Sequence, residues 1–357
     1  MCNAQERKKR DGIAMNDRCF TCHQKTRTAL PMTDRRVTDL VRDMGRMGFQ
    51  AGNLGESLRI WERMLEEEVT ILMGLAGAMV PAGLGEFIAF LVRERMVDCL
   101  VSTGANIFHD LCEGLGIVHY RGSACADDAY LKDCRIDRIH DVFVSEVELH
   151  RADKHISDFA KKLSTERRYS SRELMEMLGR GLPETTILGA AQKAGVPIFV
   201  PALGDSSIGI GMVMAYREGH KVALDQIKDV DEITQIVEQS SRTGVVYIGG
   251  GVPKNFIQQT EVIAELIGIY SGGHSYALQF TTDVPHFGGL SGCTFEEAVS
   301  WGKVAKEASK VQVFSDATIT VPLVVQALKD AGRRRKVYPA YEWREAGLKM
   351  SCHRRDG

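Results

Sequence analysis

The pattern of hydrophobic and polar positions along the chain becomes regular only from Val37 onward. Residues 55–74 carry leucines and a tryptophan at helical spacing with glutamates between them, which predicts an amphipathic helix. Short runs rich in β-branched residues recur further along, and most of them lack alternation, as is typical of strands buried on both faces. These runs lie at 97–103, 196–203, 244–251, 276–282 and 311–317.

Amphipathic stretches lie between or beside the predicted strands, near 85–95, 170–179, 254–268, 295–308 and 320–330. Strands that alternate with helices predict an α/β fold with one doubly wound, mostly parallel sheet and helices on both faces. A chain of 357 residues is long for one domain and short for two large ones. We therefore expect a single Rossmann-like domain over residues 32–345, with a loose basic tail at 1–31 and a C-terminal tail at 346–357.

The predicted tail at 1–31 contains one short motif, Cys19-Phe20-Thr21-Cys22-His23, which matches the attachment pattern of c-type haem. A five-residue pattern is easily matched by chance. Haem attachment of this kind takes place outside the cytoplasm, and no apolar stretch of an export signal follows the basic start of the chain. We expect neither haem nor a metal site here, because a metal would require further ligands nearby.

The composition of the chain points to no particular partner. Hydrophobic residues make up 44%, charged residues 26%, and the formal net charge is -2, as in an ordinary globular protein without an electrostatic bias toward nucleic acid or membrane. Nine cysteines without regular spacing indicate reduced thiols and a cytoplasmic location. No window approaches 18 uninterrupted apolar residues, so a membrane span is not expected.

Small and polar residues follow almost every predicted strand. An open α/β sheet binds ligands outside the carboxyl ends of its strands, where glycines let backbone amides approach a pyrophosphate next to the positive end of a helix. The pattern favours a dinucleotide site, although no G-x-G-x-x-G fingerprint follows the first strand. The alternative is that 249–251 form only a tight turn. The segments are Ser102-Thr103-Gly104-Ala105, Gly204-Asp205-Ser206-Ser207, Gly249-Gly250-Gly251, Thr281-Thr282-Asp283 and Ser315-Asp316-Ala317.

The segment from Glu296 to Lys303, which reads EEAVSWGK, runs from an acidic helix start into a tryptophan and a lysine. A lysine is nucleophilic only when its amine is neutral, and desolvation beside an aromatic side chain favours that form. Taken alone, such a pattern is more often a packed tryptophan and a solvated lysine on an amphipathic helix. Its interpretation therefore depends on the rest of the chain.

From about residue 56 to 330 the chain resembles the deoxyhypusine synthase family, and the EEAVSWGK segment is similar to the lysine motif of that family. The spacing from Tyr276 to Lys303 matches without a gap. A series of matching segments in the same order over most of a chain is more specific than any single motif. The other matching segments are MGFQAGNLGESLRIWERM, VDCLVSTGA, VPIFVPALGDSSIG, VVYIGGGVPKNF and VFSDATITVPLVVQAL.

The resemblance implies a homotetramer, with NAD and amine sites at subunit interfaces, and a redox-neutral reaction cycle. NAD takes a hydride from the carbon beside a secondary amine of spermidine, the lysine attacks the resulting imine, and diaminopropane leaves. The four-carbon fragment stays as an imine on the lysine, passes to an acceptor amine and is reduced by the same NADH. An acceptor lysine on a translation factor gives deoxyhypusine, whereas putrescine gives homospermidine.

The same resemblance implies roles for individual residues. Lys303 corresponds to the imine-forming lysine, Trp301 to an aromatic wall and Glu297 to an acidic contact with the amine. His109 and Asn255 occupy two further substrate-binding positions. Carboxylates that follow strands can accept hydrogen bonds from ribose hydroxyls, and no metal site is implied. The residues implied for NAD are Gly77, Ala78, Met79, Val80, Pro81, Thr103, Gly104, Ala105, Asp205, Gly250, Gly251, Thr282, Asp316 and Ala317.

The amine-binding half departs from the pattern of the family. Where eukaryotic members carry two adjacent glutamates, this chain has Phe108 and His109. Ile210 and Leu290 stand at two positions of aspartates, and Asn255 stands at the position of a histidine that contacts spermidine. Losing carboxylates forfeits the charge-assisted hydrogen bonds that recognise ammonium groups. We therefore expect an altered amine specificity and a poor use of spermidine.

Several alternatives remain open at this point. Asp110 and Asp283 lie near the affected turns, and the sequence does not show whether either compensates for the lost carboxylates. The chain is interpreted as a deoxyhypusine synthase that modifies a protein lysine, as a transferase between small amines such as a homospermidine synthase, or as a non-catalytic NAD-binding subunit. Lys303 argues against the last of these, although family resemblance alone never establishes activity.

Overall fold

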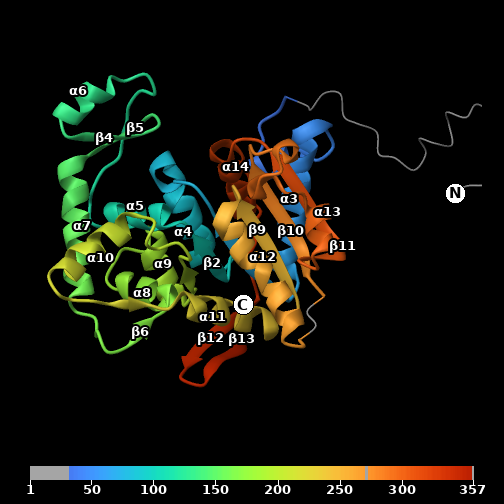
Figure 1. The fold of residues 1–357 in the computed structure, drawn as a ribbon. Coiled ribbons are helices and arrows are strands. Elements are labelled where there is room, and N and C mark those ends of the chain that lie inside the picture. The colour runs from blue at the N-terminus through green and yellow to red at the C-terminus, as the bar shows by residue number, and fades with distance from the viewer. Residues whose placement is uncertain (1–31, 270–271, 356–357) are drawn as a thin grey trace, which may run out of the picture.

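A six-stranded sheet forms the centre of the computed structural model, which describes residues 32–269 and 272–355 (Figure 1). Its order is β11-β10-β9-β1-β2-β7, and every neighbouring pair is parallel. In chain order the strands run 6-5-4-1-2-3, the doubly wound arrangement of dinucleotide-binding sheets. The predicted α/β fold is confirmed. The strands are β1 Thr70–Leu75, β2 Cys99–Ser102, β7 Ile198–Phe199, β9 Thr243–Ile248, β10 His274–Thr281 and β11 Val304–Phe314.

Both faces of the sheet are buried, as the unbroken apolar runs predict. Side chains alternate between the two faces of a strand, so Ile71 and Met73 of β1 pack in one hydrophobic cluster with Trp61 of α3 (Phe49–Glu66). Leu72 packs in a second cluster with Ile257 of α12 (Gly251–Leu266). The two clusters form the core.

Further helices and small sheets complete the domain (Figure 1). The hairpin of β4 and β5 with α6 extends from one end of the molecule, beyond α7. Within the described part of the chain, no helix has the length and apolar character of a membrane span. The remaining elements are α2 Val37–Met44, η2 Val80–Leu84, α4 Gly85–Arg93, α5 Gly104–Gly114, β3 Tyr120–Arg121, α6 Asp128–Asp133, β4 Ile136–Ile139, β5 Val142–Ser145, α7 Glu146–Ala160, β6 Arg168–Tyr169, α8 Ser171–Leu178, α9 Ile187–Ala194, α10 Ser207–Arg217, β8 Ala223–Leu224, α11 Gln226–Glu238, η3 Pro285–Phe287, η4 Leu290–Gly292, α13 Phe295–Ser300, α14 Ala317–Asp330, β12 Val337–Arg344 and β13 Gly347–Arg354.

Two predicted helices are shorter in the structure than the pattern indicates. The helix predicted at 55–74 ends at Glu66, and Thr70–Leu75 forms the central strand β1. The apolar positions of that strand continue the helical spacing, and only the neighbouring strands β2 and β9 decide its conformation. The helix predicted at 295–308 ends at Ser300, because Gly302 has a positive φ of 70° and leads directly into β11.

The C-terminal segment is a hairpin, so the prediction of a tail at 346–357 is wrong for the residues that the structure describes. β13 pairs antiparallel with β12, and Arg335 in front of the hairpin forms a buried ion pair with Asp98. Arg95 lies over the ring of Tyr338 at 4.6 Å. The predicted tail at 1–31, including the haem-like motif, lies outside the described residues.

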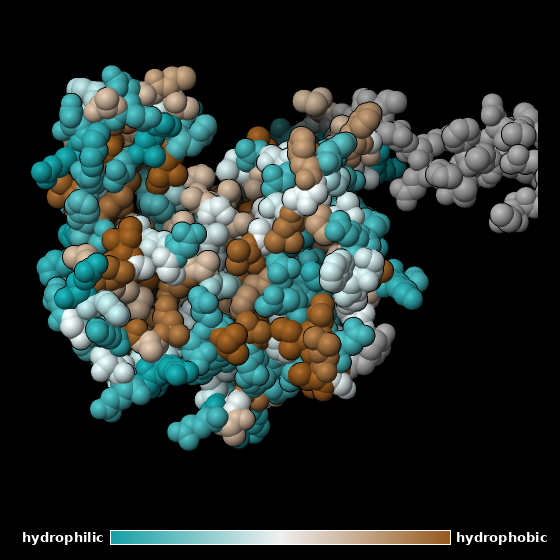
Figure 2. All heavy atoms as spheres, viewed as in Figure 1, coloured by the Kyte–Doolittle hydropathy of each residue, from teal (hydrophilic) through white to brown (hydrophobic). Residues whose placement is uncertain are grey.

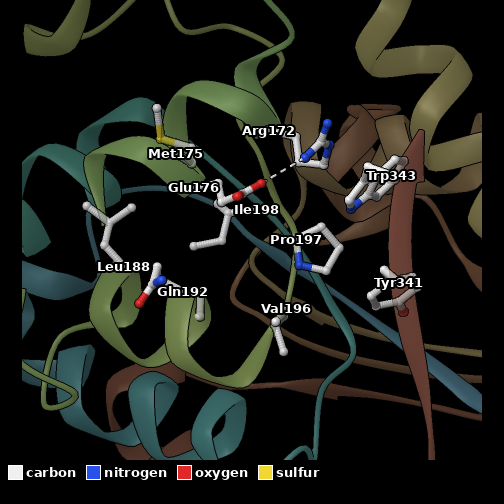
Figure 3. Close-up of a pocket in the computed structure, with 12 residues that line it drawn as sticks. Arg172, Met175, Glu176, Leu188, Gln192, Val196, Pro197, Ile198, Tyr341 and Trp343 are labelled. Atoms are coloured by element: carbon white, nitrogen blue, oxygen red, sulfur yellow. Dashed lines mark hydrogen bonds and ion pairs between the residues drawn. The ribbon is translucent and has the colours of Figure 1, made fainter. Parts of the chain in front are cut away.

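A cavity of about 180 Å³ separates this hairpin from α8 and α9 (Figure 3). Arg172 donates hydrogen bonds to both carboxylate oxygens of Glu232, pairs with Glu176, and stacks over Trp343 at 4.1 Å. The guanidinium at this cavity is therefore already paired within the chain, and the arrangement serves to hold the hairpin to the domain.

Candidate active site

A larger cavity, of about 510 Å³, opens at the carboxyl ends of β1, β2, β9, β10 and β11. β1 and β9 are the neighbours at which the strand order reverses, and doubly wound sheets bind ligands in the crevice at that point. The cavity is lined by Ala76, Gly77, Met79, Ser102, Thr103, Gly104, Ala202, Asp205, Gly249, Gly250, Gly251, Val252, Pro253, Phe280, Thr281, Thr282, Asp283, Ser291, Asp316 and Ala317.

Ten of the fourteen residues predicted to hold the dinucleotide line this one cavity. The other four do not line it: Ala78, Val80, Pro81 and Ala105. Val80 and Pro81 are buried in the π-helix η2. The amide oxygen of Asn106 accepts hydrogen bonds from the backbone N–H groups of Met79 and Val80, at 2.7 and 3.2 Å. The buried residues of η2 thus do not line the cavity, and Asn106 fixes the backbone of Met79, which does.

The cavity has the features that a pyrophosphate requires. A Cβ on Gly104 would lie 2.3 Å from Oγ of Ser206, and one on Gly250 would lie 2.5 Å from Cα of Ser291. These glycines therefore allow a close approach of the neighbouring segments that a side chain would block. The amino ends of α5, α12 and α14 meet at the cavity, so the positive ends of three helix dipoles lie at its wall. Thr103, Ser291 and Asp316 each accept a hydrogen bond from one backbone N–H at these helix starts. Asp205 and Asp316 supply carboxylates at its rim.

A second cluster surrounds the predicted nucleophile. Nζ of Lys303 donates a hydrogen bond to Oδ1 of Asn255 at 3.2 Å, and it lies 5.3 Å from the ring centroid of Trp301. Trp301 is 62% exposed, so in the single chain it does not desolvate the lysine. Glu297 is also exposed, in the first turn of α13.

The lysine cluster and the cavity are separate in the single chain but share the start of one helix. None of Lys303, Asn255, Trp301 and Glu297 lines the cavity. Gly251, at the start of α12, does line it, and Asn255 follows four residues later. The first turns of α12 therefore position both a residue of the cavity wall and the hydrogen-bond partner of Lys303.

Comparisons with known proteins assign this architecture to a family. The model of the deoxyhypusine synthase family matches residues 39–328. A Methanosarcina mazei protein named "Probable deoxyhypusine synthase 2" is 57% identical over 321 residues, which are 88% of this chain and 93% of that protein. An Archaeoglobus fulgidus protein of the same name is 53% identical over 302 residues, covering 84% and 99% of the two chains. This chain belongs to the deoxyhypusine synthase family.

A solved structure shows the same fold. The structure described as "a putative deoxyhypusine synthase from Entamoeba histolytica" superposes with a TM-score of 0.60 at 18% identity, and the match covers 86% of this chain and 98% of that one. Deoxyhypusine synthases are transferases that use NAD and a polyamine, and membership of the family supports aminobutyl transfer by this chain.

His109, one of the predicted substrate-binding residues, is buried on α5. Its Nδ1 lies 2.9 Å from Nε2 of His119, whose Nδ1 lies 3.4 Å from Oε1 of Glu113. Burial, reinforced by the charge of His119, lowers the pKa of His109 to about 4. His109 is therefore neutral near pH 7, and it adds no charge to this part of the chain.

The structure also distinguishes the two aspartates that the sequence left open. Asp110 accepts hydrogen bonds from the backbone N–H groups of Ile187 and Leu188, at 2.7 and 2.8 Å, and so holds the start of α9. Burial raises its pKa to about 7, against the lowering effect of these two bonds. Asp110 is thus committed within the chain. Asp283, by contrast, is exposed and lines the cavity.

The lowered pKa of His109 predicts a loss of stability in acid. The folded protein binds the imidazole proton only near pH 4, whereas the unfolded chain binds it near pH 6.5. Its contribution is fully present above pH 6.5 and is lost as the pH falls toward 4. Each pKa unit corresponds to about 1.4 kcal/mol, so the free energy of unfolding should fall by about 2 kcal/mol between pH 6.5 and 5 relative to His109→Gln.

Urea denaturation of both proteins at these two pH values measures that difference. If the free energy of unfolding changes equally with pH in the wild type and in His109→Gln, the pKa of His109 is not lowered in the folded protein.

Some residues of the site could not be found from the sequence. Ser291 lines the cavity although it lies in the short turn η4, away from the end of any strand. The sequence gives no sign of the contact between His119 and His109 either, because the nine residues between them show no ligand-like spacing.

Proposed function

We propose that this chain is an NAD-dependent aminoalkyl transferase that carries the transferred group as an imine on Lys303. The single observation that supports this most strongly is the glycine-walled cavity at the reversal point of the sheet, which contains ten residues predicted to hold the cofactor. The nucleophile cluster follows on the same helix start. NAD, when bound, accepts a hydride from the donor amine and later returns it.

Each residue of the lysine cluster has a proposed task in this reaction. The amine of Lys303 attacks the carbon of the oxidised donor, forms a new C–N bond and expels the leaving amine, which takes up a proton. Asn255 accepts a hydrogen bond from Nζ and directs the lysine. Trp301 offers a ring face to the positive charge of the iminium form. The acceptor amine then displaces Lys303, and the returned hydride reduces the product.

We further propose that the site is completed by a second copy of the chain in a homotetramer. The separation of the cavity from Lys303 and the exposure of Trp301 support this arrangement. Lys303 must be shielded from water to be neutral, and a second chain packed against Trp301 would supply that shielding. Phe287 is 89% exposed in the segment that forms part of the cavity wall. Figure 2 shows further hydrophobic surface around the lower end of α12, where Leu266 and Ile267 are exposed. Contiguous exposed apolar surface of this kind marks association sites.

A protein lysine on a translation factor is the acceptor in the first proposal, which makes the product deoxyhypusine. A transferase between small amines is the second candidate, and the neutral, buried His109 favours it. A pocket with fewer carboxylates neutralises less of the positive charge of spermidine. In this second case the chain forms another polyamine from two small amines.

We expect spermidine to be a poorer donor than a shorter or less cationic amine. One unreplaced charged hydrogen bond is worth roughly 1.5 to 3 kcal/mol, which predicts a kcat/KM for spermidine at least about tenfold below that of the preferred amine. Steady-state assays with NAD, a panel of donors and acceptors, and mass analysis of the products would measure this.

The variant His109→Glu is the matched control, because it restores the carboxylate and should raise the relative use of spermidine. A wild-type enzyme that prefers spermidine, with a ranking unchanged in His109→Glu, would contradict the second candidate and support the first.

A further inference from the structure

A fully buried lysine lies beneath the cofactor cavity, next to the residue that orients the nucleophile. The side chain of Lys254 on α12 is 0% exposed. Its Nζ donates hydrogen bonds to Oε1 of Gln279 at 3.0 Å and to the backbone carbonyl of Cys293 at 2.7 Å. Lysine is almost never fully buried unless its ammonium group is paired, so these contacts call for a role beyond packing.

Two glutamines extend the contacts of Lys254 into a network. Nε2 of Gln279 donates to the carbonyls of Gly249 and Ser291, each at 2.8 Å. Nε2 of Gln312 donates to Oε1 of Gln279 at 2.7 Å and to the carbonyl of Cys293 at 3.2 Å. Lys254 of α12 and Gln312 of β11 therefore both donate to the carbonyl of Cys293, and Gln279 of β10 donates to that of Ser291.

The loop that receives these bonds spans residues 284–293 and has little else to hold it. Its large apolar side chains point outward, since Val284, Phe287 and Leu290 are all exposed. Its only helical parts are the two single turns η3 and η4. Oγ of Ser291 accepts a hydrogen bond from the backbone N–H of Gly251 at 3.0 Å. A loop without buried apolar anchors depends on such polar contacts for its position.

Ser291 connects this loop to the cavity. It lines the cavity and packs against Gly250, where a side chain on the glycine would collide with its backbone. We infer that Lys254, Gln279 and Gln312 form a clamp that fixes loop 284–293 as one wall of the cofactor cavity, with Lys254 as the positioning residue. This inference rests on the proposal that the cavity holds NAD.

The burial and contacts of Lys254, and not its pKa, favour a positioning role over a nucleophilic one. Burial lowers its pKa to about 8, while Cys293 and Glu297 act in the opposite direction and Lys303 lowers it further. Its Nζ has no exposed surface and already contacts two acceptors. Lys303 is only half-buried and remains the lysine that a substrate can reach.

The substitution Lys254→Met tests the clamp, because methionine has a similar length but donates no hydrogen bond. The substitution removes the charged donor and leaves Gln312 as the described donor to both acceptors, Gln279 Oε1 and the Cys293 carbonyl. This loss should raise the Kd for NAD about tenfold or more. At saturating NAD, kcat should stay near that of the wild type while the KM for NAD rises. Lys306→Met removes a lysine exposed on β11 and serves as the control, with no change expected.

Isothermal titration with NAD and hydrogen exchange of residues 284–293 are the two readouts. Faster exchange of this loop in Lys254→Met, together with weaker NAD binding, supports the clamp. Gln312→Leu provides a second test if Lys254→Met does not fold, and it should shift both readouts in the same direction. Unchanged exchange and unchanged Kd would overturn the inference. A wild type that binds no NAD while the exchange still rises in the variant would refute the proposed function and leave the clamp in place.

Discussion

Lys303→Ala is expected to lower turnover by at least about 10³-fold, because no other accessible amine replaces the group that carries the imine. NAD binding should stay within about twofold of the wild type, since Lys303 does not line the cavity. Steady-state kinetics and titration with NAD on the same preparation separate the two effects.

Lys306→Ala is the matched control for Lys303→Ala, because it also removes a lysine from this region but at an exposed position on β11. It should leave both quantities unchanged. Substantial turnover in Lys303→Ala would show that the chain transfers its group without this lysine.

Gly250→Ala is expected to weaken NAD binding about 10- to 100-fold. The added Cβ would lie 2.5 Å from Cα of Ser291, and a backbone atom cannot move aside as a flexible side chain does. Displacing the wall of the cavity by this overpacking costs about 1 to 3 kcal/mol, which is roughly 5- to 150-fold in affinity and includes the expected loss.

Gly289→Ala is the control for Gly250→Ala. Gly289 lies in loop 284–293 together with Ser291 and has a φ of -72°, and no atom lies within 4 Å of an added Cβ. It should bind NAD like the wild type. Equal affinities for NAD in Gly250→Ala and the wild type would place the cofactor outside this cavity.

Most of the fold could be predicted from the sequence because the strands are buried on both faces and so appear as unbroken apolar runs. β1 was missed, because its apolar residues continue the helical spacing of α3 and only pairing with β2 and β9 makes the segment extended. The hairpin of β12 and β13 was missed for a related reason. It is held by remote partners such as Asp98, and no local pattern records those contacts.

Some residues of the candidate site could likewise be predicted from the sequence, and others could not. Ten of the residues predicted for the dinucleotide line one cavity, because the carboxyl ends of parallel strands meet at one edge of the sheet. Those near Gly77 were implied only by the family resemblance, since the strand before them was not predicted. Lys254 could not be recognised as a positioning residue, because its role depends on carbonyls of a loop that carries no motif. Asp110 and Asp283 look equivalent in the sequence, and only the position of α9 shows that Asp110 is already bonded.

Borohydride trapping during turnover tests the central claim most directly. Enzyme, NAD and a donor amine are mixed, the reductant converts any lysine imine to a stable secondary amine, and the peptides are identified by mass. The account predicts one aminoalkyl adduct, on Lys303, and no adduct in Lys303→Arg. An adduct on Lys254, or full activity in Lys303→Arg, would contradict it.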